Sequence, residues 1–160
     1  MRKFRITIIV CLLMALAVPF ADILAVSYTS PTYTHYIYII GHGSWLHYAV
    51  NFWTLLVLHN LFNWYRVLFS YALAVAISYV LLPELPMLGA SVITCFFIGF
   101  AAPYFWFKNR TAVLMTTCLL ILTCILPGFA GLQHVVVFFS GLSFFFVERY
   151  VRSIKQYLRE

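Results

Sequence analysis

The fold of this chain is decided by an uncharged stretch, MLGASVITCFFIGFAAPYF, at Met87–Phe105. Its length is close to the roughly 20 residues with which an α-helix crosses the hydrocarbon core of a bilayer. Five further apolar runs lie on either side of it, at 6–24, 45–61, 67–82, 112–126 and 132–147. Because lipid offers a backbone no hydrogen-bond partners, we expect each run to be a helix and not part of an open sheet. The sequence therefore predicts an all-α membrane protein, a single domain over residues 1–160 with six transmembrane helices.

The composition agrees with this interpretation. Hydrophobic residues make up 64% of the 160 residues and charged residues only 9%, whereas about a quarter of an ordinary soluble sequence is charged. The net charge of +6 does not indicate nucleic-acid binding, since the basic residues stand at the ends of the apolar runs and form no stripe. We therefore expect the lipid bilayer, and no nucleic acid, as the surroundings of this chain. The four cysteines are expected to be packing residues, neither disulfides nor metal ligands: Cys11, Cys95, Cys118 and Cys124.

The charges also predict how the chain is oriented. All ten Lys and Arg residues fall on one face if six helices alternate, and the opposite face carries only Asp22 and Glu84. By the positive-inside rule, both termini then lie in the cytoplasm. We expect a multi-pass integral membrane protein, of the bacterial cytoplasmic membrane.

Two segments near the N-terminus have features of their own. Residues 1–26 resemble a signal peptide, with a basic start and small residues near Ala21 and Ala25. The apolar run is long for a signal core, so we expect a retained helix; cleavage would leave five helices of the same sidedness. The first outer connection, Ala25–Ser44, is uncharged and rich in tyrosine, which predicts a place in the outer membrane interface. Its tyrosines are Tyr28, Tyr33, Tyr36 and Tyr38.

Polar residues inside membrane helices are costly, and each needs a reason. The second, fourth and sixth predicted helices run in the same direction, so their first turns meet near the outer leaflet. The second brings His47 and Asn51, four residues apart and so on one face. The fourth brings Ser91 about one turn in, and the sixth brings His134 near its start. Each alone is typical of a packing or interfacial residue, but their convergence at one depth indicates a functional site.

Small residues predict how two of these helices pack. Ser91, Cys95 and Gly99 recur every four residues, and Gly141 lies seven residues after His134. Such stripes let helix backbones approach closely. If the two stripes face each other, Ser91 and His134 lie at hydrogen-bonding distance above the contact. A serine beside a neutral imidazole is an activated nucleophile.

These residues resemble the motifs of the rhomboid family of intramembrane serine proteases. His42–Asn51 resembles the family's HxxxxHxxxN motif, and Gly89–Ser91 resembles the start of its GxSG motif. His134 followed by Gly141 resembles the pattern of its sixth helix. The resemblance covers nearly the whole chain and agrees in order and sidedness. It implies a rhomboid-like bundle of six transmembrane helices.

The resemblance further implies peptide hydrolysis by a Ser–His dyad. Ser91 would be the nucleophile, and His134 the general base and later the acid to the leaving amine. His47, Asn51 and the backbone N–H of Ser91 would form the oxyanion hole. No metal or organic cofactor is implied. The substrates would be single-span membrane proteins, entering from the side near the second and fifth helices; their identity and the oligomeric state have no signal in the sequence.

The chain departs from the family's pattern at several positions. Val92 follows the serine where the family usually has glycine, and Cys95 stands where it often has an aromatic residue. Val137 replaces a glycine three residues after the histidine, and the first outer loop is short and lacks a Trp-Arg pair. These departures bear on rate and substrate range more than on the dyad.

Further residues near the site have predicted roles. His42 is five residues before His47, about 140° away on a helix, so we expect a structural hydrogen bond for it and no shared metal. Asp22 or Glu84 is on the correct face to complete a triad, although neither spacing demands it. The loop Pro127–Leu132 is predicted to be a mobile cap with Phe129 as its plug.

Two other functions fit parts of this pattern. The first is a proteolytically inactive, rhomboid-like protein that binds membrane clients; such relatives typically lack the Ser or the His, and both are present here. The second is a histidine-ligated haem or metal carrier, for which His47 and His134 are the one pair at a matching depth. A metal or haem absorbance in the purified protein would favour the second function.

Overall fold

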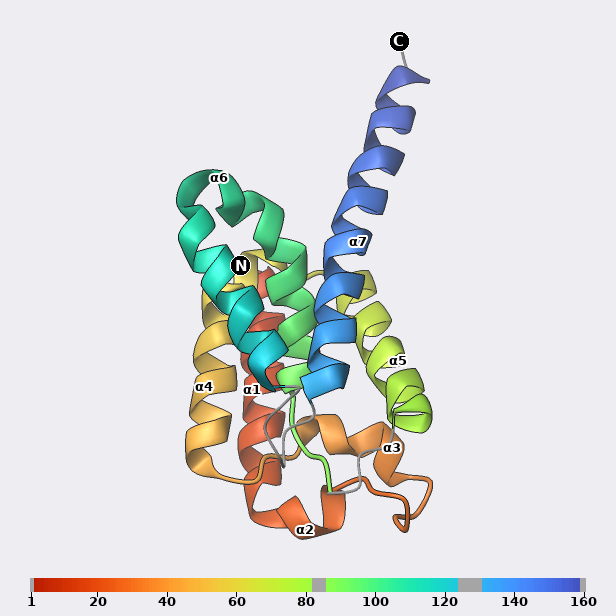
Figure 1. Ribbon diagram of the computed structural model, residues 1–160. Coiled ribbons are helices and arrows are strands. Elements are labelled where there is room, and N and C mark those ends of the chain that lie inside the picture. The colour runs from red at the N-terminus through yellow and green to blue at the C-terminus, as the bar shows by residue number, and fades with distance from the viewer. Residues whose placement is uncertain (1, 82–85, 124–130, 159–160) are drawn as a thin grey trace.

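The computed structural model (Figure 1) describes residues 2–81, 86–123 and 131–158. Within these ranges the chain is helical, and its one β-like feature is an isolated bridge between Val26 and Met87. The predicted all-α architecture is confirmed at this level. Three of the predicted features lie outside the described residues: the cap around Phe129, the carboxylate of Glu84 and the thiol of Cys124.

The helices follow the order of the apolar runs. The first run forms α1 (Arg2–Ala17), η1 (Val18–Phe20) and α2 (Ala21–Leu24), and the outer connection contains α3 (Thr34–Ile37) and η2 (Tyr38–Ile40). Then come α4 (Trp45–Val57), η3 (His59–Leu61), α5 (Trp64–Val80), α6 (Ser91–Thr123) and α7 (Gly131–Tyr157).

Three helical stretches are long and apolar enough to cross a membrane: Arg5–Leu24, Ser91–Cys118 and Gly131–Tyr157. The apolar helix α5 is shorter. The outer surface is rich in large apolar side chains, such as Leu46 at 76% and Phe107 at 89% exposure. Large apolar side chains on the exterior are favourable in contact with lipid and unfavourable in water, as expected for a membrane protein.

The helix that carries Ser91 begins later than the prediction of Met87. Met87 instead pairs with Val26, each backbone N–H donating to the other's carbonyl at 2.8 and 2.9 Å. Gly89 has a φ of +127°, which a right-handed helix cannot contain. Ser91 is therefore the first residue of α6 and not one turn inside it.

Two other helix boundaries differ from the sequence prediction. The fourth and fifth runs form two helical segments, the two halves of α6, joined by a sharp reversal at Asn109, where the backbone leaves the helical region (φ −155°, ψ 77°) (Figure 1). The Asn109 Oδ1 accepts a hydrogen bond from the N–H of Ala112 at 3.0 Å and so caps the second half. The last helix continues to Tyr157, ten residues beyond the predicted end of the apolar run.

The first half of α6 forms the centre of the molecule, with contacts to α4, α5 and α7. Its phenylalanines Phe96, Phe97 and Phe100 are fully buried. In Figure 1, α4 and α5 lie on opposite sides of this central helix. The residue that begins α6 is thereby held on the best-packed element of the fold.

The outer connection is only partly the exposed interfacial segment that its tyrosines predict. Tyr28, Tyr33 and Tyr36 are about half exposed or more. Tyr38 is fully buried, contrary to the prediction, and its hydroxyl donates to the carbonyl of Ala74 on α5 at 3.0 Å. The connection is therefore anchored to the bundle and does not simply lie along its surface.

Candidate active site

Ser91 opens α6 immediately after a supported turn. The N–H of Gly89 donates to the carbonyl of Tyr38 at 3.0 Å, so the buried part of the outer connection holds the segment before the serine. The first N–H groups of a helix have no acceptor within that helix, and they form its positive end. The backbone at Ser91 is thus suited to stabilise a negative charge beside the serine.

The small residues of α6 and α7 bring the two helices into backbone contact. A Cβ on Gly99 would lie 1.9 Å from the carbonyl oxygen of Phe138, and one on Gly141 would lie 2.1 Å from that of Phe96. Only glycine fits either position. The predicted facing of the two stripes is present in the structure, with Ser91 and His134 at the same end of the contact.

The side chains of Ser91 and His134 meet above this contact. Ser91 Oγ lies 2.8 Å from His134 Nε2, a hydrogen bond between residues 43 apart in the chain. Within the described residues, Ser91 Oγ has no other hydrogen-bond partner. The hydroxyl can therefore donate to the imidazole when the ring proton of His134 is on Nδ1, and both side chains are only partly buried.

A second Ser–His contact in the molecule differs in this respect. His35 Nδ1 lies 2.9 Å from Ser78 Oγ, where the outer connection packs on α5. The Ser78 hydroxyl donates to the carbonyl of Val75 at 2.7 Å, so the imidazole must be the donor to it. Both residues are buried, and His35 stacks on Tyr79 with ring centroids 4.0 Å apart. This pair joins the outer connection to α5. Its serine donates to a backbone carbonyl and not to the histidine, so the pair is not arranged as a nucleophile and its base.

His47 lies against the backbone that precedes the serine. A Cβ on Gly89 would lie 2.8 Å from Cε1 of the His47 ring, so the glycine leaves room for the imidazole. His47 is in the first turn of α4, which Ser44 caps by accepting from the His47 N–H at 3.1 Å. The half-buried ring thus packs against Gly89, which is two residues before Ser91 in the chain.

Asn51 is buried between α4 and α6. Its Nδ2 donates to the carbonyl of His47 at 3.0 Å, and its Oδ1 accepts from the hydroxyl of Thr94 at 3.1 Å. One amide N–H remains to donate elsewhere. The sequence analysis did not single out Thr94, because a membrane-helix threonine ordinarily bonds back to its own helix, as this one also does to Ala90 at 3.0 Å.

His42 is not on the helix of His47, as the angular argument assumed, but in the connection before it. Its Nδ1 is 3.3 Å from the carbonyl of Ile40, the structural hydrogen bond that was expected. The ring centroids of His42 and His47 are 5.1 Å apart. The Nε2 of His42 is buried without a partner among the described residues. Burial, and then the nearby imidazole of His47, lower the pKa of His42 to about 4.

The structure gives the dyad no carboxylate partner within the described ranges. His134 has Ser91 as its one hydrogen-bond partner there, and Asp22 is exposed on α2. No three His, Cys, Asp or Glu side chains of the described chain are grouped so as to hold a metal ion.

The three departures from the rhomboid pattern are all buried side chains. Val92 and Val137 are in the hydrophobic core, at 1% and 0% exposure, and Cys95 is 5% exposed beneath the dyad. They fill the space between helices. The dyad geometry therefore forms with these residues in place.

Comparisons with protein-family models, with curated proteins and with solved structures find no match for this chain. The resemblance to the rhomboid family rests on the motifs in the sequence.

Proposed function

We propose that this chain is an intramembrane serine endopeptidase with six transmembrane helices and both termini in the cytoplasm. The observation that carries the proposal is the 2.8 Å contact between Ser91 Oγ and His134 Nε2. Structural serines in membrane helices usually donate to their own backbone, as Ser78 and Ser140 do here. Within the described residues, Ser91 makes no such backbone bond and has an imidazole nitrogen as its partner.

The reaction would follow the serine-hydrolase scheme with two residues. Ser91 Oγ attacks the substrate carbonyl carbon while His134 Nε2 takes its proton, which requires the tautomer with hydrogen on Nδ1. The imidazolium then protonates the amine that leaves, and water hydrolyses the acyl-enzyme by the same steps. No cofactor enters this scheme.

Three groups are available for the oxyanion. The N–H of Ser91 is at the free start of α6, the His47 ring packs against Gly89, and Asn51 retains one amide N–H. In a shallow, partly dry site such donors act more strongly than in water. Thr94 would serve as a positioning residue that holds the Asn51 carboxamide by its oxygen.

A groove supports the lateral entry of a substrate span. It has a volume of about 490 Å³ and lies between α4 and the two halves of α6. Its lining includes Trp53, Val57, Ala101, Phe105 and Val113. Ala101 is ten residues from Ser91, or roughly 15 Å along a helix, so the groove would receive side chains of the span beyond the cleaved bond.

The proposal is tested by two matched serine variants. Ser91→Ala should abolish labelling by a fluorophosphonate and cleavage of any single-span substrate, since it removes the nucleophile. Ser78→Ala, which breaks the other Ser–His contact, should keep both. Labelling that persists in Ser91→Ala and disappears in Ser78→Ala would show that Ser78 is the reactive serine, and it would overturn the proposal.

The same experiment addresses the inactive, client-binding alternative. Wild-type protein that folds, retains a membrane client and shows neither labelling nor cleavage would favour that function. Comparing membrane proteomes of cells with wild type and with Ser91→Ala identifies the substrate as the fragment that disappears.

A further inference from the structure

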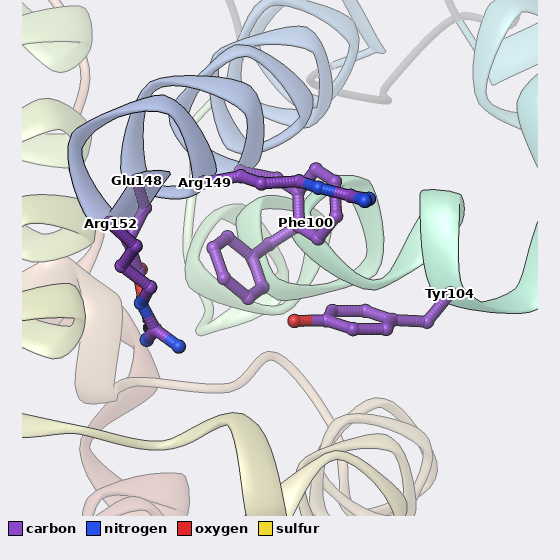
Figure 2. A pocket seen from close by; sticks show the side chains of 6 residues that line it. Phe100, Tyr104, Glu148, Arg149 and Arg152 are labelled. Carbon is purple, nitrogen blue, oxygen red and sulfur yellow. Dashed lines mark hydrogen bonds and ion pairs between the residues drawn. The ribbon is translucent and has the colours of Figure 1, made fainter. Parts of the chain in front are cut away.

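A second cleft lies at the far end of the α6–α7 contact from the dyad. It has a volume of about 200 Å³ and is open to the surface. Six residues line it: Phe100, Tyr104, Phe145, Glu148, Arg149 and Arg152. Figure 2 shows Arg149 and Arg152 on α7 facing Phe100 and Tyr104 on α6 across this cleft.

The floor of the cleft is aromatic. Phe100 and Phe145 are buried, with ring centroids 5.6 Å apart, and Tyr104 packs edge-on against Phe145 at 4.9 Å. Tyr104 is 52% exposed. The floor is therefore apolar, with an accessible ring at its rim.

The side chains around the cleft carry more positive than negative charge. Glu148 accepts two hydrogen bonds from the Arg66 guanidinium, at 2.9 and 2.6 Å, and also pairs with Arg152. Arg66 is buried and stacks over Phe100, with its guanidinium carbon 4.3 Å from the ring centroid. Arg149 has an exposed guanidinium that makes no hydrogen bond or ion pair with any described side chain. One carboxylate thus faces three guanidinium groups.

In the topology proposed above, the cleft lies at the depth of a lipid head group. Arg149 follows Gly131 by eighteen residues, roughly 27 Å along a helix, and the hydrocarbon core is about 30 Å thick. Arg66, Lys108, Arg110 and Lys155 belong to the same basic end of the chain's helices. In the cytoplasmic leaflet, anionic lipids attract basic residues next to the membrane.

We infer that this cleft is a binding site for the phosphate head group of an anionic phospholipid. Arg149 supplies the unpaired guanidinium, whose fork matches phosphate oxygens. Arg152 contributes a second charge from the next turn of α7, and the rings of Phe145 and Tyr104 contact the glycerol and the first methylenes. The inference rests on the proposed topology and does not depend on proteolysis.

The test compares two lipids that share acyl chains, phosphatidylglycerol and phosphatidylcholine, on the full-length protein in detergent. Binding is measured by native mass spectrometry and by the shift of the unfolding temperature. Wild type should bind phosphatidylglycerol saturably and in preference to phosphatidylcholine. Arg149→Gln should weaken that binding about tenfold or more, because a charge-assisted hydrogen bond is lost.

Lys155→Gln is the control, since it removes the same charge from an exposed position of α7 outside the cleft. It should weaken binding by no more than about fivefold, the effect of one surface charge. Equal losses in the two variants would show diffuse attraction and overturn the site. Equal binding of the two lipids would also overturn it, and displacement by inorganic phosphate as effective as by the lipid would make free phosphate the ligand.

A loss of lipid binding is separable from a loss of catalysis. Arg149→Gln leaves Ser91 and His134 untouched, so fluorophosphonate labelling should persist in it. Conversely, Ser91→Ala should bind phosphatidylglycerol like wild type.

Discussion

At the scale of single residues, Thr94 and Asn51 have separable roles. Asn51→Ala should lower turnover by about 10²-fold, as for loss of one oxyanion donor. Thr94→Val removes the anchor of that carboxamide and leaves Asn51 Oδ1 buried without a donor. It should lower the stability by about 1–3 kcal/mol, and it should lower turnover less than Asn51→Ala does. Rates are measured in liposomes and stability by thermal unfolding.

The control for Thr94 is Thr116→Val; among the described residues, its hydroxyl bonds to the carbonyl of Ala112 in its own helix and to no other group. It should change stability by less than about 0.5 kcal/mol. If Asn51→Ala and Thr94→Val both lower stability while specific activity stays at the wild-type value, Asn51 only joins the helices and is no oxyanion donor.

His42 predicts a dependence of stability on pH. Its pKa in the folded protein is about 4, mainly because of burial, whereas an unfolded histidine titrates near 6.5. The neutral ring therefore stabilises the fold fully above about pH 6.5, and this contribution is lost as pH falls towards 4, by no more than about 3 kcal/mol. The unfolding temperature in detergent should fall over that range, and less so in His42→Gln. Equal slopes in the two proteins would assign the effect to other groups.

At the scale of helices, the contact of α6 with α7 depends on two missing side chains. Gly141→Ala places a methyl group 2.1 Å from the carbonyl oxygen of Phe96, so the helices must separate. Both stability and labelling of Ser91 should fall, because the same separation moves His134 away from the serine. Overpacking of this kind costs about 1–3 kcal/mol or more.

Gly43→Ala is the matched control, because a methyl group there meets no atom within 4 Å. Unfolding temperature and fluorophosphonate labelling should both stay near wild type in it. Wild-type labelling in Gly141→Ala would show that the dyad does not need the close helix contact.

The helix contact and the dyad were predictable from the sequence because both follow from helical periodicity. Ser91, Cys95 and Gly99 share a face, and so do His134 and Gly141, so two stripes of small residues specify one another. Thr94 was not predictable, since its second hydrogen bond depends on how α4 lies against α6.

The helix ends were less predictable, for different reasons. Hydropathy marks where apolar residues stop, but Glu, Arg and Lys are good helix formers, and α7 continues through them to Tyr157. The start of α6 depends on the pairing of Met87 with Val26, residues far apart in the sequence. The inward turn of Tyr38 depends likewise on a carbonyl of α5.

At the scale of the whole molecule, the distribution of charge predicts the topology. Thr32→Cys in the outer connection should react with an impermeant thiol reagent added outside intact cells, and Arg110→Cys should not. Both positions are exposed on the protein, and the exposed Cys118 is replaced by Ala in both variants. The reason is that, in the proposed six-helix topology, all ten basic residues fall on the other face. The reverse labelling pattern would place the dyad on the cytoplasmic side.

The 43-residue separation of the dyad also sets the order of events during biosynthesis. The ribosome delivers Ser91 well before His134, which belongs to the last helix. In a nascent chain that has inserted α1 to α6, Ser91 has no histidine beside it. The face of α6 that α7 will cover is still uncovered. If the chain is the protease proposed above, we therefore expect the growing polypeptide to be inert towards its neighbours in the translocation machinery, with hydrolytic competence arising only when α7 docks.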